Sequence, residues 1–143
     1  MIREMVYEDI ETVFSIEQET FSMPWSKSSF IECVYSEYDY AFVYEAQDIV
    51  LGYVIVQFVV DTAHLINIAV SESHRGQGIG KELLKFVIEY FKNKLCEKIF
   101  LDVRVSNKNA IKLYENFGFE KVFIQKNLYE RPTEDGYLME LKI

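Results

Sequence analysis

Apolar and polar positions repeat with two different periods along the chain, and the changes of period predict where helices and strands lie. Residues 2–7 read as an opening strand, and Asp9 is a good N-cap for the helix that follows. The apolar face of that helix is formed by Ile10, Val13, Phe14 and either Ile16 or Phe21. Ser26 can cap a second, shorter helix, whose apolar residues are Phe30, Cys33 and Val34.

The middle of the chain is rich in strand patterns. Residues 40–45 and 49–60 form a hairpin pattern around residues 46–48. A second turn, at residues 61–62, leads into a strand that ends at Val70. Runs of this kind, separated by short polar turns, are typical of consecutive paired strands. We therefore predict an antiparallel meander of three strands.

The last part of the chain alternates helices and strands. A helix pattern from Gly78 to about Lys92 is followed by a strand at residues 98–104, and a helical crossover predicts that this strand runs parallel to the one ending at Val70. Ser106 or Asn107 caps the next helix and Gly118 ends it. Residues 119–129 and 137–143 then close the sheet. The prediction is one α/β domain over residues 1–143, with a central, mostly antiparallel sheet, one parallel pair at its middle and helices on both faces.

Residues 74–81 place glycines where a strand becomes a helix. Gly76, Gly78 and Gly80 allow the backbone to come close to a ligand, and the free N–H groups of a first helical turn favour an anion. A Walker loop would need Gly at position 75 and Ser or Thr at position 82, where the chain has Arg75 and Glu82. A dinucleotide fingerprint would need a third Gly where Lys81 stands. The remaining pattern is Arg-x-x-Gly-x-Gly, which predicts a phosphate-binding loop; an ordinary strand-to-helix turn is the alternative.

The amino-acid composition limits the kinds of partner that the protein can bind. The chain has 23 acidic and 15 basic residues, a formal charge of −8. This balance argues against sequence-independent nucleic-acid binding, which needs a basic face. It suits a basic peptide partner, although a merely acidic surface explains it equally well. Neither a signal peptide nor a stretch long enough to span a bilayer stands out, so we expect a cytoplasmic protein without a membrane partner.

The cysteines and histidines are too few and too scattered to predict a metal site or a disulfide framework. Cys33 and Cys96 stand alone, and only His64 and His74 could join them as metal ligands. We expect no metal.

Two residues stand out as candidates for chemistry. Asp102 interrupts an otherwise apolar strand, and a buried carboxylate is costly unless it is paired or used. Its alternative role is a salt bridge to Arg104, which strand alternation places on the same face. Tyr114 lies on a helix face with Ala110 and Phe117, where a core aromatic with a satisfied hydroxyl is the usual finding. The residues alone leave both roles open.

The segment at residues 21–26 concentrates large apolar side chains beside Pro24. Exposed, such a segment would form a wall for a substrate; buried, it would be a plug over the core. Periodicity alone favours the plug.

Taken together, these patterns resemble the GCN5-related N-acetyltransferases, and within them the bacterial ribosomal-protein alanine N-acetyltransferase subfamily. The resemblance rests on the glycine loop and on further blocks that cover most of the chain: Phe-Ser-Met-Pro-Trp-Ser, Asn-Ile-Ala-Val, Leu-Asp-Val-Arg-x-Ser-Asn, Ala-Ile-x-Leu-Tyr-Glu-x-x-Gly-Phe and Glu134-Asp135. It implies that the parallel strands splay apart and that acetyl-CoA lies in the gap, its pantetheine arm bonded to backbone like an added strand.

The resemblance also implies roles for individual residues. The residues implied to bind coenzyme A are Ile68, Ala69, Val70, Arg75, Gly76, Gln77, Gly78, Ile79, Gly80, Lys81 and Asn107. Tyr114 would be the general acid that protonates the coenzyme A thiolate. Asp102 stands where the family has a glutamate base, one methylene longer, so a bridging water would be needed to restore its reach. Pro24, Trp25 and Tyr129 would form the wall for the incoming peptide. Leu128 stands where relatives often have a second tyrosine.

The implied activity is acetyl transfer from acetyl-CoA to a protein N-terminal amine, the N-terminal alanine of a small-subunit ribosomal protein. An α-amine with a pKa of about 8 is partly neutral at pH 7, whereas a lysine of about 10.4 is not, so an N-terminal amine needs only a weak base. Three alternatives stay open: an acetyltransferase for lysine or small-molecule amines, a non-catalytic acyl-CoA-binding module, and a structural protein without a ligand.

Overall fold

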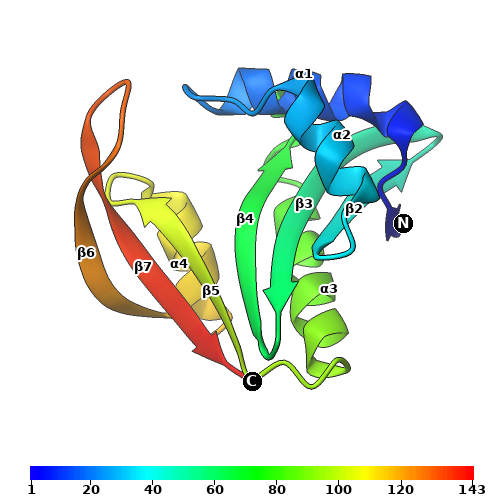
Figure 1. The fold of residues 1–143 in the computed structure, drawn as a ribbon. Helices are drawn as coiled ribbons and strands as arrows, with labels where there is room; N and C mark the ends of the chain where they lie inside the picture. The colour runs from blue at the N-terminus through cyan, green and yellow to red at the C-terminus, as the bar shows by residue number, and fades with distance from the viewer.

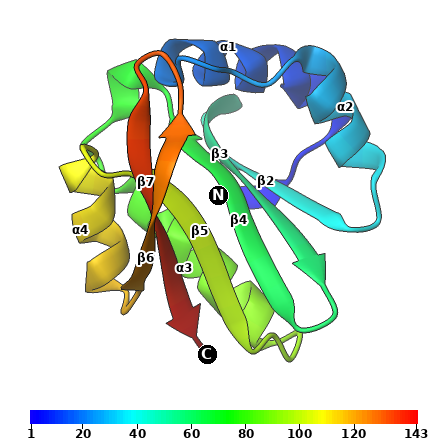
Figure 2. The same cartoon turned by 60° about the vertical axis from the view of Figure 1, so that its left-hand side comes forward.

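The computed structural model describes all 143 residues and arranges them as a twisted sheet with two helices on each face (Figures 1 and 2). Its elements in chain order are β1 (Ile2–Glu4), η1 (Tyr7–Asp9), α1 (Ile10–Thr20), α2 (Lys27–Tyr35), β2 (Asp39–Ala46), β3 (Ile49–Val59), β4 (Thr62–Val70), η2 (Glu72–His74), α3 (Ile79–Lys92), β5 (Lys98–Arg104), α4 (Lys108–Asn116), β6 (Glu120–Tyr129) and β7 (Glu134–Lys142). This confirms the predicted α/β class.

The sheet order is β1-β2-β3-β4-β5-β7-β6, and β4–β5 is its one parallel pair. The antiparallel meander of β2, β3 and β4 is confirmed, and so is the parallel pair after the crossover helix α3. The last two strands do not follow in chain order, because β7 lies between β5 and β6. After α4 the chain first forms the edge strand β6, and it then returns as β7 between β5 and β6.

The parallel pair holds together only at its beginning. Its three paired positions are Thr62↔Lys98, Ala63↔Ile99 and His64↔Phe100, and β4 and β5 then diverge (Figure 1). The β3–β4 register shifts directly after this point, between Ile55 and Val56, and leaves Ile66 without a partner. A bulge of this kind bends its strand and re-aims the side chains that follow. The divergence therefore opens the sheet beside the bulge.

Each face of the sheet has its own apolar core. Val13, Phe30 and Tyr53 belong to the buried cluster under α1 and α2, while Leu83 and Phe91 belong to the larger cluster under α3 and α4. Fully burying one such side chain contributes about 1.5–3 kcal/mol. The two cores fix the sheet from both sides, so that the opening between β4 and β5 is held by packed helices.

The helix starts follow the predicted caps with one exception. Ser26 accepts a hydrogen bond from the Ser29 N–H at 3.2 Å, as predicted. Asp9 does not cap α1; its carboxylate accepts from the Val6 N–H at 2.8 Å and pairs with Arg3, so it holds η1 instead. The opening strand is also shorter than predicted, because the chain turns into η1 after Glu4. No helix combines the length and the apolar character that a membrane crossing requires.

Candidate active site

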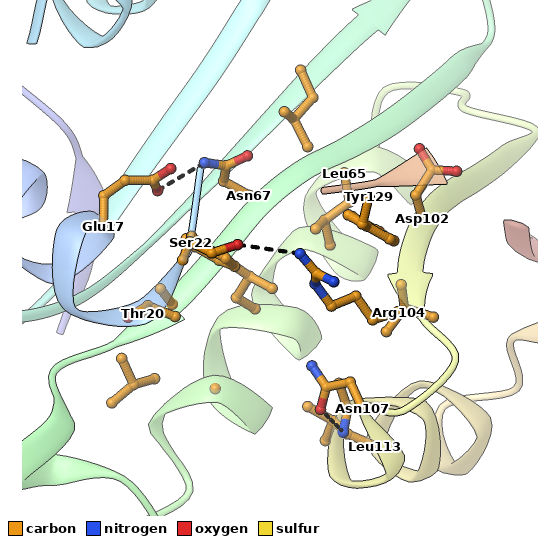
Figure 3. Close-up of a pocket in the computed structure, with 18 of the residues that line it drawn as sticks. Glu17, Thr20, Ser22, Leu65, Asn67, Asp102, Arg104, Asn107, Leu113 and Tyr129 are labelled. Atoms are coloured by element: carbon orange, nitrogen blue, oxygen red, sulfur yellow. Dashed lines mark hydrogen bonds between the residues drawn. The ribbon is translucent and has the colours of Figure 1, made fainter. Parts of the chain in front are cut away.

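The divergence of β4 and β5 opens a cleft of about 500 Å³ (Figure 3). Its walls come from α1, the α1–α2 loop, β4, β5, α4 and the end of β6. Among the residues predicted for a site, those that line the cleft are Trp25, Ile68, Ala69, Val70, Arg75, Gly80, Asp102, Asn107, Tyr114 and Tyr129. Residues far apart in the chain therefore meet in one cavity.

The glycine loop lies at one end of this cleft, at the start of α3. Gly76 and Gly78 have φ of 78° and 83°, a left-handed conformation that favours glycine. The first helical hydrogen bond is donated by Glu82 to the Gly78 carbonyl. The N–H groups of residues 79–81 therefore have no helical acceptor and can bind an anion. Of the predicted loop residues, Gly76, Gln77, Gly78 and Lys81 are exposed outside the cleft, whereas the Ile79 side chain is buried in the core.

Arg75 has contacts that the loop pattern did not predict. Its Nε donates to the Val70 carbonyl at 3.1 Å, and its Nη2 donates to the Thr20 hydroxyl at 2.8 Å. The side chain thus joins the end of α1 to the end of β4 beside the glycine loop.

Asp102 lies on β5 and faces the cleft (Figure 3). Its carboxylate accepts a hydrogen bond from Gln125 Nε2 at 2.5 Å, and His64 Nε2 lies 3.6 Å from its other oxygen. The pKa of Asp102 is lowered, first by the neighbouring His64 and then by the Gln125 hydrogen bond, which together outweigh partial burial. Asp102 is therefore ionised at neutral pH.

The alternative role of Asp102, a salt bridge to Arg104, is not found in the structure. Arg104 pairs with Glu134 at 3.1 Å and donates to the Glu130 carbonyl at 2.7 Å and to the Ser22 hydroxyl at 3.2 Å. Its guanidinium also lies 4.6 Å from the centre of the Tyr129 ring. Ser22 lies in the α1–α2 loop, Glu130 lies in the β6–β7 loop, and Glu134 begins β7. Arg104 therefore connects the α1–α2 loop to the β6–β7 hairpin across the cleft.

Tyr114 lines the cleft from α4 and is only 6% exposed. Burial, with a smaller contribution from the neighbouring Tyr129, raises the pKa of its hydroxyl. The pKa of Tyr129 is raised to about 12, first by burial and then by the charge of Asp102. Both phenols therefore stay protonated at neutral pH and can act as hydrogen-bond or proton donors.

Asn107 caps α4 and also lines the cleft. Its Oδ1 accepts from the Ala110 N–H at 3.3 Å, which confirms the predicted cap of α4. Because a backbone N–H can only donate, the carboxamide presents its NH₂ group to the cleft side.

The α1–α2 loop is a wall of the cleft and not a plug over the core. Phe21, Met23 and Pro24 are exposed, and Phe21 and Met23 line the cleft, while Pro24 does not. Trp25 is half-buried and lies with its ring centre 5.2 Å from that of Phe30. The predicted plug is not found, because most of the apolar residues of the loop line the cleft. The cleft depends on how distant segments pack, which the periodicity of the loop does not reveal.

Glu17, Asn67, His64 and Gln125 were not identified from the sequence. Glu17 and Asn67 line the cleft, and His64 and Gln125 contact Asp102. Glu17 could have been found from the sequence, because it is a charged residue on the apolar face of α1 that includes Ile10 and Val13. The others depend on contacts between distant strands.

The two parallel strands part beside a glycine loop, and the opening contains a protonated tyrosine and an ionised aspartate. These features are those of an α/β transferase that depends on acyl-CoA. The comparison with known proteins agrees with this class. Residues 10–119 match the model of the acetyltransferase (GNAT) family, and the chain belongs to that family.

Individual relatives are similar along nearly the whole chain. The chain is 37% identical to a Bacillus subtilis strain 168 protein named as a candidate [ribosomal protein bS18]-alanine N-acetyltransferase, covering 99% of this chain and 95% of that protein. It is 35% identical to the [ribosomal protein bS18]-alanine N-acetyltransferase of Haemophilus ducreyi, covering 99% of both. The crystal structure of the ribosomal-protein-S18-alanine N-acetyltransferase from Escherichia coli matches with a TM-score of 0.94 at 32% identity, covering 100% of this chain and 93% of that one.

Proposed function

We propose that the protein transfers the acetyl group of acetyl-CoA to the N-terminal amine of a protein, with the N-terminal alanine of ribosomal protein bS18 as the substrate, and that residues 1–143 act as one N-acetyltransferase domain. The observation that carries this proposal is a single cleft that reaches from the start of α3 to Asp102 and Tyr114. The names of the relatives supply the substrate. A ribosomal substrate would place the reaction in the cytoplasm.

Acetyl-CoA fits this cleft by the chemistry of its lining. The unpaired N–H groups at the start of α3 suit its pyrophosphate. Beyond His64, the β4 edge that faces β5 has no strand partner, so its backbone groups are available to an extended arm. The NH₂ group of Asn107 lies on the opposite side of the cleft and can donate to that arm. The thioester would then lie between β4 and β5, close to Tyr114.

The transfer step needs one proton acceptor and one proton donor. The neutral amine nitrogen attacks the thioester carbon, a C–N bond forms, and collapse of the tetrahedral intermediate breaks the C–S bond. The ionised Asp102, beside His64, accepts the proton that the nitrogen loses, through a water that makes up for its shorter side chain. Tyr114 gives its proton to the departing thiolate and regains one from solvent.

An acetyl-transfer assay tests this proposal. Acetyl-CoA is offered with a peptide that begins with the bS18 alanine, with an N-blocked peptide that contains lysine, and with a polyamine. We expect transfer to the free α-amine alone. Transfer to lysine or polyamine in preference would support the second candidate, which the shorter Asp102 and the aliphatic Leu128 favour. Acetyl-CoA binding without transfer to any amine would indicate a binding module.

A further inference from the structure

Glu17 is a buried carboxylate that the transfer mechanism does not use. It lies in α1 at the edge of the cleft and is 1% exposed. Burying a charge is costly unless it is hydrogen-bonded. Glu17 has three donors from three segments: the Tyr53 hydroxyl on β3, Asn67 Nδ2 on β4 at 2.9 Å, and the Trp25 N–H in the α1–α2 loop at 2.9 Å. The carboxylate therefore joins one wall of the cleft to the strand that faces acetyl-CoA.

These bonds fix the orientation of the Asn67 carboxamide. Both Glu17 oxygens accept hydrogen bonds from the protein, so the Asn67 NH₂ group faces Glu17 and its Oδ1 faces away. Figure 3 shows Asn67 between Glu17 on one side and the opening toward β5 on the other. Oδ1 accepts no hydrogen bond from the protein. The cleft thus has a fixed acceptor across from Asp102.

A hydrogen-bond acceptor at the position of Asn67 Oδ1 is suited to bind the substrate amine. A neutral amine has two N–H groups and one lone pair, and the lone pair must point at the thioester carbon. If one N–H is held by the acceptor on β4 and the other is directed toward the water at Asp102 on β5, the lone pair is left between the two strands. The acceptor holds the amine to the same extent before and during attack, so its contribution is to binding of the amine.

We infer that Asn67 binds the substrate amine through its Oδ1 and that Glu17 is the positioning residue that turns this oxygen into the cleft. The inference rests on the proposed function, because it concerns the amine that the enzyme acetylates. It assigns recognition of the amine to the α1 and β4 side and proton removal to the β5 side.

Glu17→Gln tests the inference because only one orientation of the new side-chain amide satisfies its hydrogen-bond partners. The Trp25 N–H can only donate, so the new amide oxygen must face it, and the new NH₂ group must face Tyr53 and Asn67. The Tyr53 hydroxyl can rotate to accept. Asn67 must turn its oxygen toward residue 17 and present NH₂ to the cleft, where it opposes an N–H donor.

The expected results are shifts in KM. Glu17→Gln and Asn67→Leu raise the KM for the acetylated amine roughly tenfold, the loss of about one good hydrogen bond, and leave the KM for acetyl-CoA within about twofold. In the double variant Glu17→Gln with Asn67→Asp, one carboxylate oxygen accepts from the new amide and the other faces the cleft. We expect the double variant to recover the wild-type KM within about threefold.

Two controls separate positioning from general damage. Glu11→Gln makes the same substitution on an exposed position of α1, and Tyr53→Phe removes a Glu17 partner that lies outside the cleft. Both should leave the KM for the amine within about twofold. An unchanged KM in Asn67→Leu, a double variant as poor as Glu17→Gln, or an equal rise in Tyr53→Phe would overturn the inference.

The amine panel keeps the two proposals distinguishable. The KM is measured on whichever amine the wild-type enzyme acetylates. Transfer to lysine or polyamine instead of the α-amine would remove the proposed substrate and still measure the role of Asn67. Acetyl-CoA binding with no transfer to any amine would overturn both proposals.

Discussion

The two walls of the cleft each present a carboxylate, and the two are used differently. On the α1 side, Glu17 is 1% exposed and has three protein donors. On the β5 side, the Asp102 side chain is 30% exposed, with one hydrogen bond from Gln125 and a longer contact with His64. A carboxylate whose oxygens are occupied by the protein fixes geometry, whereas one that is open to the cleft can exchange a proton with water or substrate.

Because of this difference, we expect substitutions on the two walls to have different effects. Substitutions on the β5 and α4 side should change the chemical step, and substitutions on the α1 side should change stability and amine binding.

Tyr114→Phe should lower kcat by about 10²–10³, because it removes the proton donor for the thiolate at little change in shape. The KM for acetyl-CoA should stay within about twofold. Steady-state kinetics with varied acetyl-CoA measure both. An unchanged kcat would remove Tyr114 from the mechanism and leave it as a core aromatic.

Glu17→Ala should destabilise the fold by about 2–4 kcal/mol, because it leaves the Tyr53 hydroxyl, Asn67 and the Trp25 N–H without their acceptor. Urea unfolding of the variant against wild type measures this change. Glu11→Ala serves as the control, since its exposed ion pair with Lys27 should contribute less than about 1 kcal/mol. Equal losses for the two variants would contradict a special role for the buried carboxylate.

Asp102→Ala should lower kcat about 10- to 100-fold, the smaller range expected when a base acts through water and the α-amine is partly neutral. Asp102→Glu lengthens the side chain by one methylene, which shortens the gap that the water bridges, and should retain the wild-type kcat or exceed it. Single-turnover transfer to the alanine peptide measures the step itself. If Asp102→Ala keeps full activity, proton removal must occur elsewhere.

Local patterns explain how much of this could be predicted from the sequence. Strand and helix periods, the Ser26 and Asn107 caps and the glycines before α3 depend on neighbours in the chain, and they were predicted well. The position of β7 between β5 and β6 depends on pairing over long separations, and the sequence pattern did not predict it. The same limit explains the missed bulge at Ile66, which re-aims Asn67.

Side-chain partners were predicted less well than elements. Arg104 lies on the same strand face as Asp102, but acceptors in two loops lie closer to it, and neither loop is near it in the chain. His64 and Gln125 reach Asp102 from two other strands. Glu17 was overlooked because a single charged residue within an amphipathic helix is usually solvated, and only the fold shows that it is buried.

The smallest predicted effect concerns acid stability. The pKa of Asp102 is lower in the folded protein than its ordinary value of about 3.9, so its interactions stabilise the fold above that value and are lost as pH falls through the lowered pKa. Asp102→Asn should therefore be less stable than wild type by up to about 1 kcal/mol near pH 6, with a difference that shrinks below about pH 4. Urea unfolding across this pH range measures it. A difference that grows on acidification would contradict the sign.

The division between the two walls is tested most directly by measuring kcat and the peptide KM for Asp102→Ala and Glu17→Gln side by side, on the alanine peptide at neutral pH. We expect Asp102→Ala to lower kcat at nearly constant KM, and Glu17→Gln to raise KM roughly tenfold while kcat stays within about threefold. A loss of kcat with unchanged KM in Glu17→Gln, or a raised KM with unchanged kcat in Asp102→Ala, would contradict it.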